Sequence, residues 1–177
     1  MRKIVYYVAA SVDGFIAGAD DDISGFIQQG EGIDQYLLDL QHFDTVIIGR
    51  KTYAFGYKFG LQPGQPAYPL MEHYIFSNTL TFDHPHGKVH VSRLEIEKIK
   101  ALKNEVGSDI YLCGGGQLAG WLLDHQMIDT LKIKLNPLVL GQGVRLLGAS
   151  QARCQLTLKA HETFDDGLQI ITYTVSY

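Results

Sequence analysis

The sequence has too few cysteines and too few long apolar runs for several large classes of protein. Among its 177 residues only Cys113 and Cys154 are cysteines, which argues against the disulfide framework of a small secreted domain. No apolar run approaches the roughly 20 residues that a membrane-spanning helix needs. The apolar stretch at residues 4–11 enters a turn without a convincing cleavage site, which predicts a first strand rather than a signal peptide. We therefore expect a cytoplasmic protein with no membrane segment.

Positive charge is scarce as well. The 15 lysines and arginines and 19 acidic residues give a formal net charge of −4. Because no basic stripe is evident, the sequence argues against a general nucleic-acid binder. With 46% hydrophobic and 19% charged residues the composition is that of a folded protein, and the length predicts one domain over residues 1–177. We therefore expect a small molecule as the main partner.

Apolar runs typical of strands alternate with helical patterns along the chain. The runs at residues 4–11 and 45–49 are apolar almost throughout, as in the central strands of a parallel sheet. Residues 33–40 between them repeat apolar side chains at helical spacing. In a later strand, alternation makes Lys132 and Lys134 face one way, and an Asp-Asp-Gly hairpin signal follows near the C-terminus. The order predicts an α/β domain with a mostly parallel sheet and an antiparallel C-terminal hairpin.

Three consecutive glycines, residues 114–116, stand between an apolar strand pattern at 110–113 and an amphipathic helix pattern. The glycines could simply make a tight turn that lets the helix pack close to the sheet. They could instead expose backbone N–H groups at a helix N-terminus, where an anion binds. The second hypothesis predicts that Gly116→Ala weakens ligand binding and leaves the fold close to native, whereas the first predicts a change in stability alone.

Polar residues follow two more of the predicted strands. The strand at 45–49 leads into Gly-Arg-Lys-Thr at residues 49–52, and the strand at 73–76 leads into Ser77 and Asn78. The two cations at the start of that helix would oppose its dipole, so a bound anion explains them better than a solvated helix start does. Because the carboxyl ends of parallel strands meet at one edge, these corners predict an extended polyanionic ligand. A dinucleotide with two or three phosphates fits that description.

Several motifs together resemble the dihydrofolate reductase-like superfamily. In order they are AASVDGFIAG, IIGRKTY, IFSN, CGGGQLAGWLLDHQMIDTLKI and NPLVLGQGVRLL, and the similarity spans nearly the whole chain. The last motif, with Pro137, Gly141 and Gly143, resembles the branch that contains the riboflavin-biosynthesis reductase domain (RibD C-terminal domain-like). The resemblance implies a three-layer α/β/α fold around a mixed, mostly parallel sheet, NADPH as the hydride donor, and a homodimer. A tyrosine-rich C-terminal strand at residues 168–177 would be an exposed sheet edge unless a second copy covers it.

The resemblance also implies roles for individual residues. The nicotinamide would be bordered by Ala9, Ile16 and the backbone of Cys113, whose thiol need not react. The phosphate side would be held by Gly49, Arg50, Lys51 and Thr52. The adenosine 2′-phosphate would be met by Ser77, Asn78 and Arg93. The pyrophosphate would be cradled by Gly115, Gly116, Gln117 and Leu118.

The substrate is less defined than the cofactor. The resemblance implies a reductase of the 5-amino-6-(5-phosphoribosylamino)uracil type, acting on a C=N or C=O carbon of a small heterocyclic or sugar-linked substrate. However, Phe15 stands where the riboflavin enzymes usually carry a basic residue, and the tryptophan of the folate-enzyme lid is missing. Two alternatives stay open, a dihydrofolate reductase and a non-catalytic NADP-binding module.

Asp34 is the one candidate catalytic residue. It lies near the start of the helix that, in folate reductases, carries a buried acid that orients the substrate and helps deliver a proton. The alternative is a carboxylate in the first helical turn that satisfies the helix dipole.

Two stretches could in principle hold a metal ion. The loop from Asp20 to Glu31 fits the spacing of a calcium loop, but it lacks the entering helix that such a loop requires. His84, His86 and His90 lie close together in sequence, where Pro-Gly turn chemistry explains them equally well. We expect no metal site in either stretch.

Overall fold

The computed structural model describes all 177 residues, and a mixed eight-stranded sheet forms its centre. The strands lie in the order β5-β4-β3-β6-β1-β7-β10-β9. The first six are parallel to their neighbours, and β10 is antiparallel to both β7 and β9. Their bounds are β1 Ile4–Ser11, β3 Thr45–Gly49, β4 Glu72–Phe76, β5 Val89–Ser92, β6 Ile110–Gly114, β7 Thr130–Asn136, β9 Gln155–Thr163 and β10 Gln169–Ser176.

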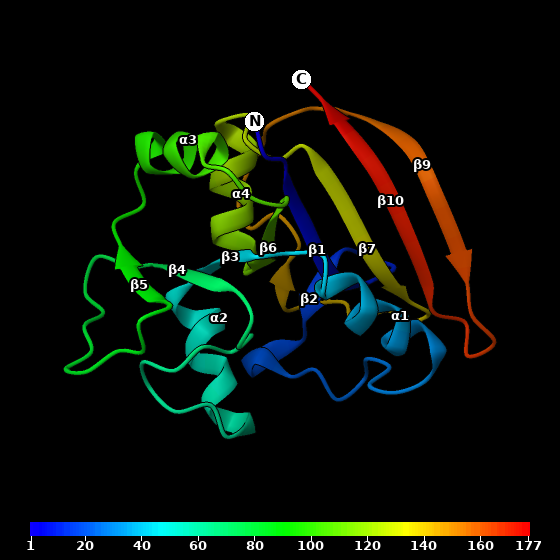
Figure 1. Ribbon diagram of the computed structural model, residues 1–177. Coiled ribbons are helices and arrows are strands. Elements are labelled where there is room, and N and C mark those ends of the chain that lie inside the picture. The colour runs from blue at the N-terminus through cyan, green and yellow to red at the C-terminus, as the bar shows by residue number, and fades with distance from the viewer.

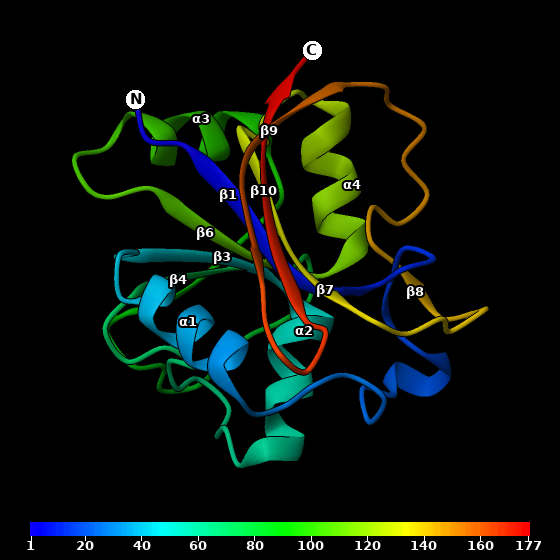
Figure 2. The same ribbon diagram turned by 90° about the vertical axis from the view of Figure 1, so that its right-hand side faces the viewer.

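Helices cover both faces of this sheet. Figure 2 shows α3 and α4 over one face and α1 and α2 over the other. The helices span Glu31–Leu40 (α1), Arg50–Phe55 (α2), Ile96–Asn104 (α3) and Gly116–Asp124 (α4), with short 3-10 turns at Ala19–Asp21 and Gly56–Phe59. The predicted α/β/α layers and the mostly parallel sheet with its C-terminal hairpin are therefore confirmed. None of the helices has the length and apolar character that a membrane crossing requires.

The core lies on both faces of the central strands because their side chains alternate. Tyr6 of β1 belongs to a cluster of 15 buried residues that also holds Leu118 and Leu122 of α4. Its neighbour Tyr7 belongs to a second cluster of seven, together with Leu40 of α1. A continuous apolar run such as β1 is buried on both faces for this reason.

The C-terminal strand does not form an edge of the sheet, contrary to our expectation. We predicted that this strand would be an exposed edge, but β10 lies between β7 and β9 and is paired on both sides. The edge is β9 instead, seen at the right of Figure 1, and all nine of its residues are exposed. The correction has a simple cause, because the hairpin folds β9 to the outside of β10.

The amino ends of the parallel strands are tied together by buried charges. Arg2, just before β1, donates hydrogen bonds to Asp44 and, at 2.8 Å, to Thr45 Oγ1 at the start of β3. Lys103 at the end of α3 donates to Asp129 Oδ2 at 2.6 Å, and the same oxygen accepts the N–H of Ile4 at 2.7 Å. These contacts fix the strand register at the end of the sheet opposite the predicted ligand edge.

Candidate functional site

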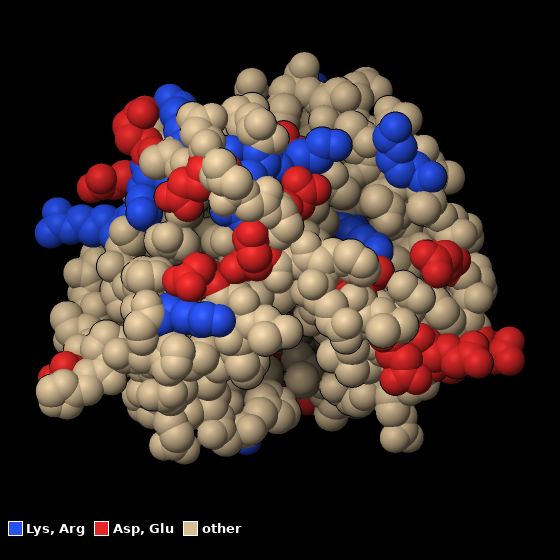
Figure 3. All heavy atoms as spheres, in the orientation of Figure 1, with Lys and Arg blue, Asp and Glu red and all other residues tan.

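Residues from three distant parts of the chain meet at the carboxyl ends of the central strands. A methyl group on Gly115 would lie 2.8 Å from Thr52 Oγ1 and 4.0 Å from Ile16 Cδ1. One on Gly49 would lie 3.8 Å from both the oxygen of Gly114 and the nitrogen of Gly115. The structure thus brings Ile16, Gly49, Thr52 and Gly115 together. In the space-filling view, the surface is hollowed between the parts formed by α1 and α2 (Figure 3).

Two neighbours of Gly115 contribute to packing. A methyl group on Gly116 would lie 2.0 Å from the oxygen of Arg145, which follows Val144 in the two-residue strand β8 (Val144–Arg145). Backbone atoms cannot yield easily to such a clash, so the expectation of a near-native Gly116→Ala fold is wrong. The side chain of Leu118 is in the core and only 5% exposed. Of the four residues predicted to cradle a pyrophosphate, Gly115 and the exposed Gln117 remain open to solvent.

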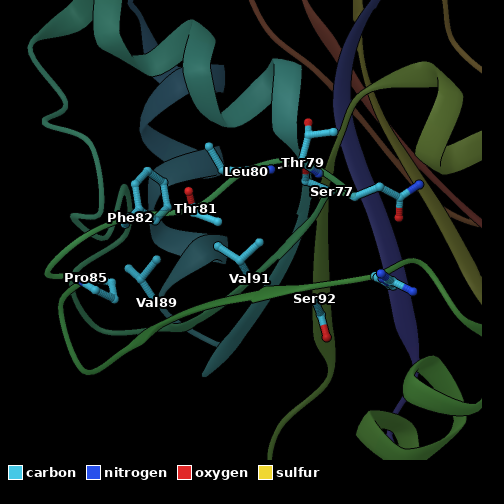
Figure 4. A pocket seen from close by; sticks show the side chains of 11 residues that line it. Ser77, Thr79, Leu80, Thr81, Phe82, Pro85, Val89, Val91 and Ser92 are labelled. Carbon is cyan, nitrogen blue, oxygen red and sulfur yellow. Dashed lines mark hydrogen bonds between the residues drawn. The ribbon is translucent and has the colours of Figure 1, made fainter.

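A second hollow lies where β4 and β5 end. Ser77, Asn78 and Arg93 line a cavity of about 420 Å³ together with the loop after β4. Figure 4 shows Ser77 and, from the end of β5, Ser92 at one end of it, and Phe82 and Pro85 at the other. Ser77 Oγ accepts the N–H groups of two residues of its own loop, at 3.2 and 3.0 Å, and so shapes the rim. All three residues predicted for the adenosine end therefore share one cavity.

Three predicted cations lie free at this edge of the sheet. Arg50 and Lys51 occupy the first turn of α2, Arg93 follows β5, and all three side chains are exposed. None takes part in any of the ion pairs of the protein. Their charge is therefore available to an anion from solution.

A further group, which sequence reasoning did not assign, lies on the face of the sheet that α1 covers. Lys134 of β7 is the cross-strand partner of Ala9 in β1, so both side chains project from this face. Its Nζ lies 3.4 Å from the centroid of the Tyr36 ring on α1. Burial lowers the pKa of Lys134 to about 8. Strand alternation predicts the direction in which its side chain projects, but only the position of α1 shows that the side chain is half-buried.

The thiol of Cys113 is held in its neutral form beside this lysine. Its Sγ lies 3.3 Å from the hydroxyl oxygen of Tyr68. Burial raises the pKa of Cys113, and the Tyr68 hydrogen bond opposes that shift only in part. These surroundings do not activate a nucleophile, which agrees with a role through the backbone alone.

Comparison with known proteins decides the family. The sequence model described as the RibD C-terminal domain matches residues 2–170. The chain belongs to the RibD C-terminal domain family. Bacillus subtilis (strain 168) has a relative described as uncharacterized protein YwjB, which is 31% identical over 180 residues, 96% of each chain.

Solved structures share the fold of this family member. A putative riboflavin biosynthesis protein from Shewanella sp. PV-4 superimposes with a TM-score of 0.81 at 22% identity, covering 99% of both chains. A Thermotoga maritima diaminohydroxyphosphoribosylaminopyrimidine deaminase/5-amino-6-(5-phosphoribosylamino)uracil reductase gives 0.72 at 14% identity, covering 98% of this chain and 56% of that one. Enterococcus faecalis dihydrofolate reductase complexed with NADP(H) and RAB-propyl gives 0.67 at 15% identity, covering 98% and 96%. The predicted dihydrofolate reductase-like fold is confirmed.

The last motif of this RibD-family chain has a structural explanation that sequence reasoning missed. The carboxylate of Asp13, in the turn after β1, accepts the N–H groups of Leu140 and Gly141. The hydroxyl of Ser11, and then these N–H groups, hold the pKa of Asp13 at about 2. A methyl group on Gly143 would lie 2.1 Å from the oxygen of Ala17. Asp13 and Gly143 therefore join the turn after β1 and strand β2 (Phe15–Ala17) to the segment that ends in β8.

The candidate catalytic acid is not where the resemblance implies a buried one. Asp34 lies in the first turn of α1 with an exposed side chain, and it makes no side-chain hydrogen bond or ion pair. The carboxylate of α1 that reaches the sheet is Asp39, which accepts from Tyr7 Oη at 2.9 Å and from Lys132 Nζ at 2.5 Å. The exposure of Asp34 favours the helix-dipole alternative over catalysis. Helical spacing could have identified Asp39, which lies three residues after Tyr36, whose ring packs against Tyr7 of β1.

The two stretches weighed for metal binding do not gather ligands. The structure holds no group of three or more His, Cys, Asp or Glu side chains that could bind a metal ion. In the loop from Asp20 to Glu31, the carboxylate of Asp22 accepts hydrogen bonds from Ser24. Among the three histidines, His90 pairs with Glu72 at 2.9 Å.

Proposed function

We propose that the protein is an NADPH-dependent reductase that transfers a hydride to a C=N or C=O carbon of a small heterocyclic or sugar-linked substrate. The observation that carries the proposal is the meeting of Ile16, Thr52 and Gly115 at the carboxyl ends of central parallel strands, where such sheets bind ligands. The shared fold with a uracil reductase and with a dihydrofolate reductase complexed with NADP(H) supports it. Substrates of the 5-amino-6-(5-phosphoribosylamino)uracil type are the first candidates.

The residues at the glycine corner fit a pyrophosphate. The space beside Gly115 would be filled by a single methyl group, because that group would come within 2.8 Å of Thr52 Oγ1. A glycine keeps this space open and lets a phosphate approach the backbone closely. The first N–H groups of α4 begin here, and the dipole of this helix favours an anion. Arg50 and Lys51 add two unpaired positive charges in the first turn of α2, directly after the neighbouring strand β3.

The cavity at the ends of β4 and β5 fits the adenosine end. An arginine guanidinium can hold a phosphate through two hydrogen bonds, and Arg93 has no carboxylate that competes for it. Ser77 and Asn78 add a hydroxyl and an amide to the same cavity. This donor set favours NADPH, which carries a 2′-phosphate, over NADH.

The chain itself would bind and orient the reactants. When bound, the reduced nicotinamide supplies the hydride. Ala9, Ile16 and the backbone of Cys113 would hold its ring, and the hollow between α1 and α2 would place a substrate against it. Fixing two reactants in one geometry lowers the activation barrier, because the entropic cost of bringing them together is met when they bind.

The cofactor proposal is tested by titrating NADPH and NADH into the wild type, Arg93→Ala and Arg153→Ala. Arg153 is an exposed arginine without an ion pair that lies outside the proposed site, so it serves as a matched control. We expect the wild type to prefer NADPH at least tenfold. Arg93→Ala should lose about 1.5–3 kcal/mol of NADPH binding, the usual worth of a hydrogen bond to a charged group, with NADH affinity unchanged. Equal wild-type affinities for the two cofactors would overturn the preference.

The reductase proposal is tested by following NADPH absorbance with a panel of carbonyl and imine compounds. The panel includes 5-amino-6-(5-phosphoribosylamino)uracil and dihydrofolate. Oxidation of NADPH by members of the panel supports the proposal, and a clear preference for dihydrofolate would favour the folate alternative. Tight NADPH binding without oxidation by any compound would identify a non-catalytic NADP-binding module.

We also propose a homodimer, through the exposed edge of the sheet. The free edge of β9 offers unpaired backbone groups, and Leu156 and Leu158 on it are 45% and 57% exposed. An open apolar edge is prone to pair with another strand. Light scattering at micromolar concentration should give twice the chain mass, and Leu158→Lys should shift the protein toward the monomer.

A further inference from the structure

Two lysines on the same face of β7 have opposite surroundings. Lys132 Nζ donates to Asp39 Oδ2 at 2.5 Å, so its charge is neutralised. Two residues later, Lys134 Nζ has no hydrogen-bond acceptor and no ion pair, and its contact is the face of the Tyr36 ring at 3.4 Å. A charge covered by protein without a counter-charge lowers stability. Groups of this kind cluster at functional sites, where the surroundings are arranged for chemistry.

The position of Lys134 is next to the proposed nicotinamide wall. Its cross-strand partner is Ala9, and the pKa of each of Lys134 and Cys113 responds to the charge of the other. The neighbouring hydroxyls lie in hydrogen-bonded pairs, Tyr36 with Tyr111 at 2.8 Å and Tyr68 with Cys113. Lys134 is a cation whose ammonium protons have no acceptor.

We infer that Lys134 is the proton donor for the reduction, an inference that rests on the proposed function. A hydride from the reduced nicotinamide adds to the carbon of a C=O or C=N group. The electron pair of the π bond moves onto the oxygen or nitrogen, which takes a proton from Lys134 Nζ. The nicotinamide ends oxidised, the substrate ends as an alcohol or amine, and the neutral Lys134 amine regains its proton from water.

The electrostatics of this face suit such a role. Burial lowers the pKa of Lys134 to about 8, and the negative form of Cys113 would oppose that shift. A donor whose pKa lies near the working pH transfers protons effectively. Burial raises the pKa of Cys113. It raises the pKa of Tyr68 and of Tyr111 well above the usual range of a tyrosine, and the pKa of Tyr36 to about 12.

Other charged groups lie on this face of the sheet, farther from Lys134. Asp39 of α1 bonds to Lys132 of the same strand and to Tyr7 of β1. Glu162 of β9 lies on the same face, separated from Lys134 by Ile170 of β10. A single proton-transfer step near pH 8 on this face is therefore assigned to Lys134.

The first experiment measures kcat between pH 6 and 10 with NADPH and phenanthrenequinone, a planar dicarbonyl probe, beside any substrate that the panel identifies. The wild type should lose activity above about pH 8, because the donor is then deprotonated. Lys134→Met should lose about 100-fold or more in kcat, the usual contribution of a general acid, with little change in KM and without the limb near pH 8. Lys134→Arg keeps the charge but cannot release the proton, so it should not restore the rate.

The matched control is Lys132→Met, on the same strand and face, whose pH profile should keep the limb near 8. A second readout needs no turnover, since NMR of isotope-labelled lysine follows each ammonium group through a titration. The signal missing from Lys134→Met should titrate near pH 8, well below the value of about 10.4 for a lysine in a model peptide. A Lys134 signal that titrates near the model-peptide value overturns the inference.

The outcomes distinguish a failure of the Lys134 inference from a failure of the proposed reductase function on which it rests. If the wild type oxidises NADPH with no carbonyl or imine compound, the proposed function fails and the proton donor fails with it. If the wild type is active and Lys134→Met or Lys134→Arg matches its rate and pH profile, the inference alone is wrong.

Discussion

The two ends of the parallel sheet treat charge in opposite ways. At the amino ends, Arg2 and Lys103 are buried, and each is bonded to a carboxylate at the start of a strand, Asp44 or Asp129. At the carboxyl ends, the cations Arg50, Lys51 and Arg93 are exposed without partners, and Lys134 on the nearby sheet face is covered without one. Paired charges at one end fix the register of the strands. Unpaired charges at the other end remain free to bind a ligand, although they lower the stability of the protein.

The amino end gives the largest expected effect. Asp129→Ala should lower the free energy of unfolding by about 3–5 kcal/mol, because it leaves the Lys103 ammonium buried and unpaired. Urea denaturation measures the change. Glu97→Ala, which breaks the exposed pair with Lys100, should cost about 0.5 kcal/mol or less. Similar losses in both variants would mean that the amino end is not held by its buried pairs.

Substitutions at the adjacent residues Gly115 and Gly116 should have different effects, one mainly on NADPH binding and the other mainly on stability. Gly116→Ala should lower the free energy of unfolding by about 1–3 kcal/mol, since its methyl group would clash with the backbone of Arg145. Gly115→Ala should instead weaken NADPH binding tenfold or more, about 1.4 kcal/mol, with a smaller loss of stability.

Thermal unfolding and cofactor titration on both variants make this comparison. Gly87→Ala is the control, because nothing lies within 4 Å of the added methyl group. An unchanged NADPH affinity in folded Gly115→Ala would show that the corner is only a turn.

Removing the unpaired lysine should stabilise the protein. Lys134→Met should raise the free energy of unfolding at pH 7 by about 1–2 kcal/mol, because an apolar side chain of similar length replaces an uncompensated charge. The pKa of Lys134 is lowered from 10.5 to about 8 in the folded protein, so the unfolded chain binds more protons between these values. The wild type should therefore gain stability as the pH rises from 8 to 10.5.

Chemical denaturation of both proteins at several pH values tests the sign. The advantage of Lys134→Met should be largest below pH 8 and should vanish above 10.5. An advantage that does not depend on pH would come from packing rather than from charge.

The smallest effect is expected at Asp34. Because its side chain is exposed and makes no hydrogen bond or ion pair, Asp34→Asn should change stability by about 0.5 kcal/mol or less and leave kcat nearly unchanged. Asp39→Asn is the informative partner, since it weakens the contacts to Lys132 and Tyr7. A large loss of kcat in Asp34→Asn would restore it as the catalytic acid.

Local patterns predicted the strands, the helices and the edge at which the candidate site lies. The apolar run of β1 and the alternation in β7 are properties of neighbouring residues, so they can be read along the chain. The meeting of the Gly-rich and polar corners after β3 and β6 could also be predicted, because parallel strands place their carboxyl ends at one edge whatever the details of packing.

Features that depend on distant contacts could not be predicted in this way. Gly116 is a packing residue because Arg145 lies against it, and Lys134 is covered because α1 crosses its face. The choice between Asp34 and Asp39 depends on which side of α1 meets the sheet. The position of β10 inside the sheet depends on how the hairpin folds back. The sequence patterns of β9 and β10 would allow either strand to lie next to β7.

The place of β1 in the sheet has a consequence for synthesis on the ribosome. β1 emerges before every other strand of this sheet, yet its two neighbours are β6 and β7, from much later in the chain. Its apolar segment therefore stays unpaired while most of the protein is translated, and the hydrogen bonds from Leu140 and Gly141 to Asp13 form only once those residues exist. Such a delay exposes the nascent chain to aggregation, so its yield in the cell should depend on chaperones that shelter the N-terminal segment.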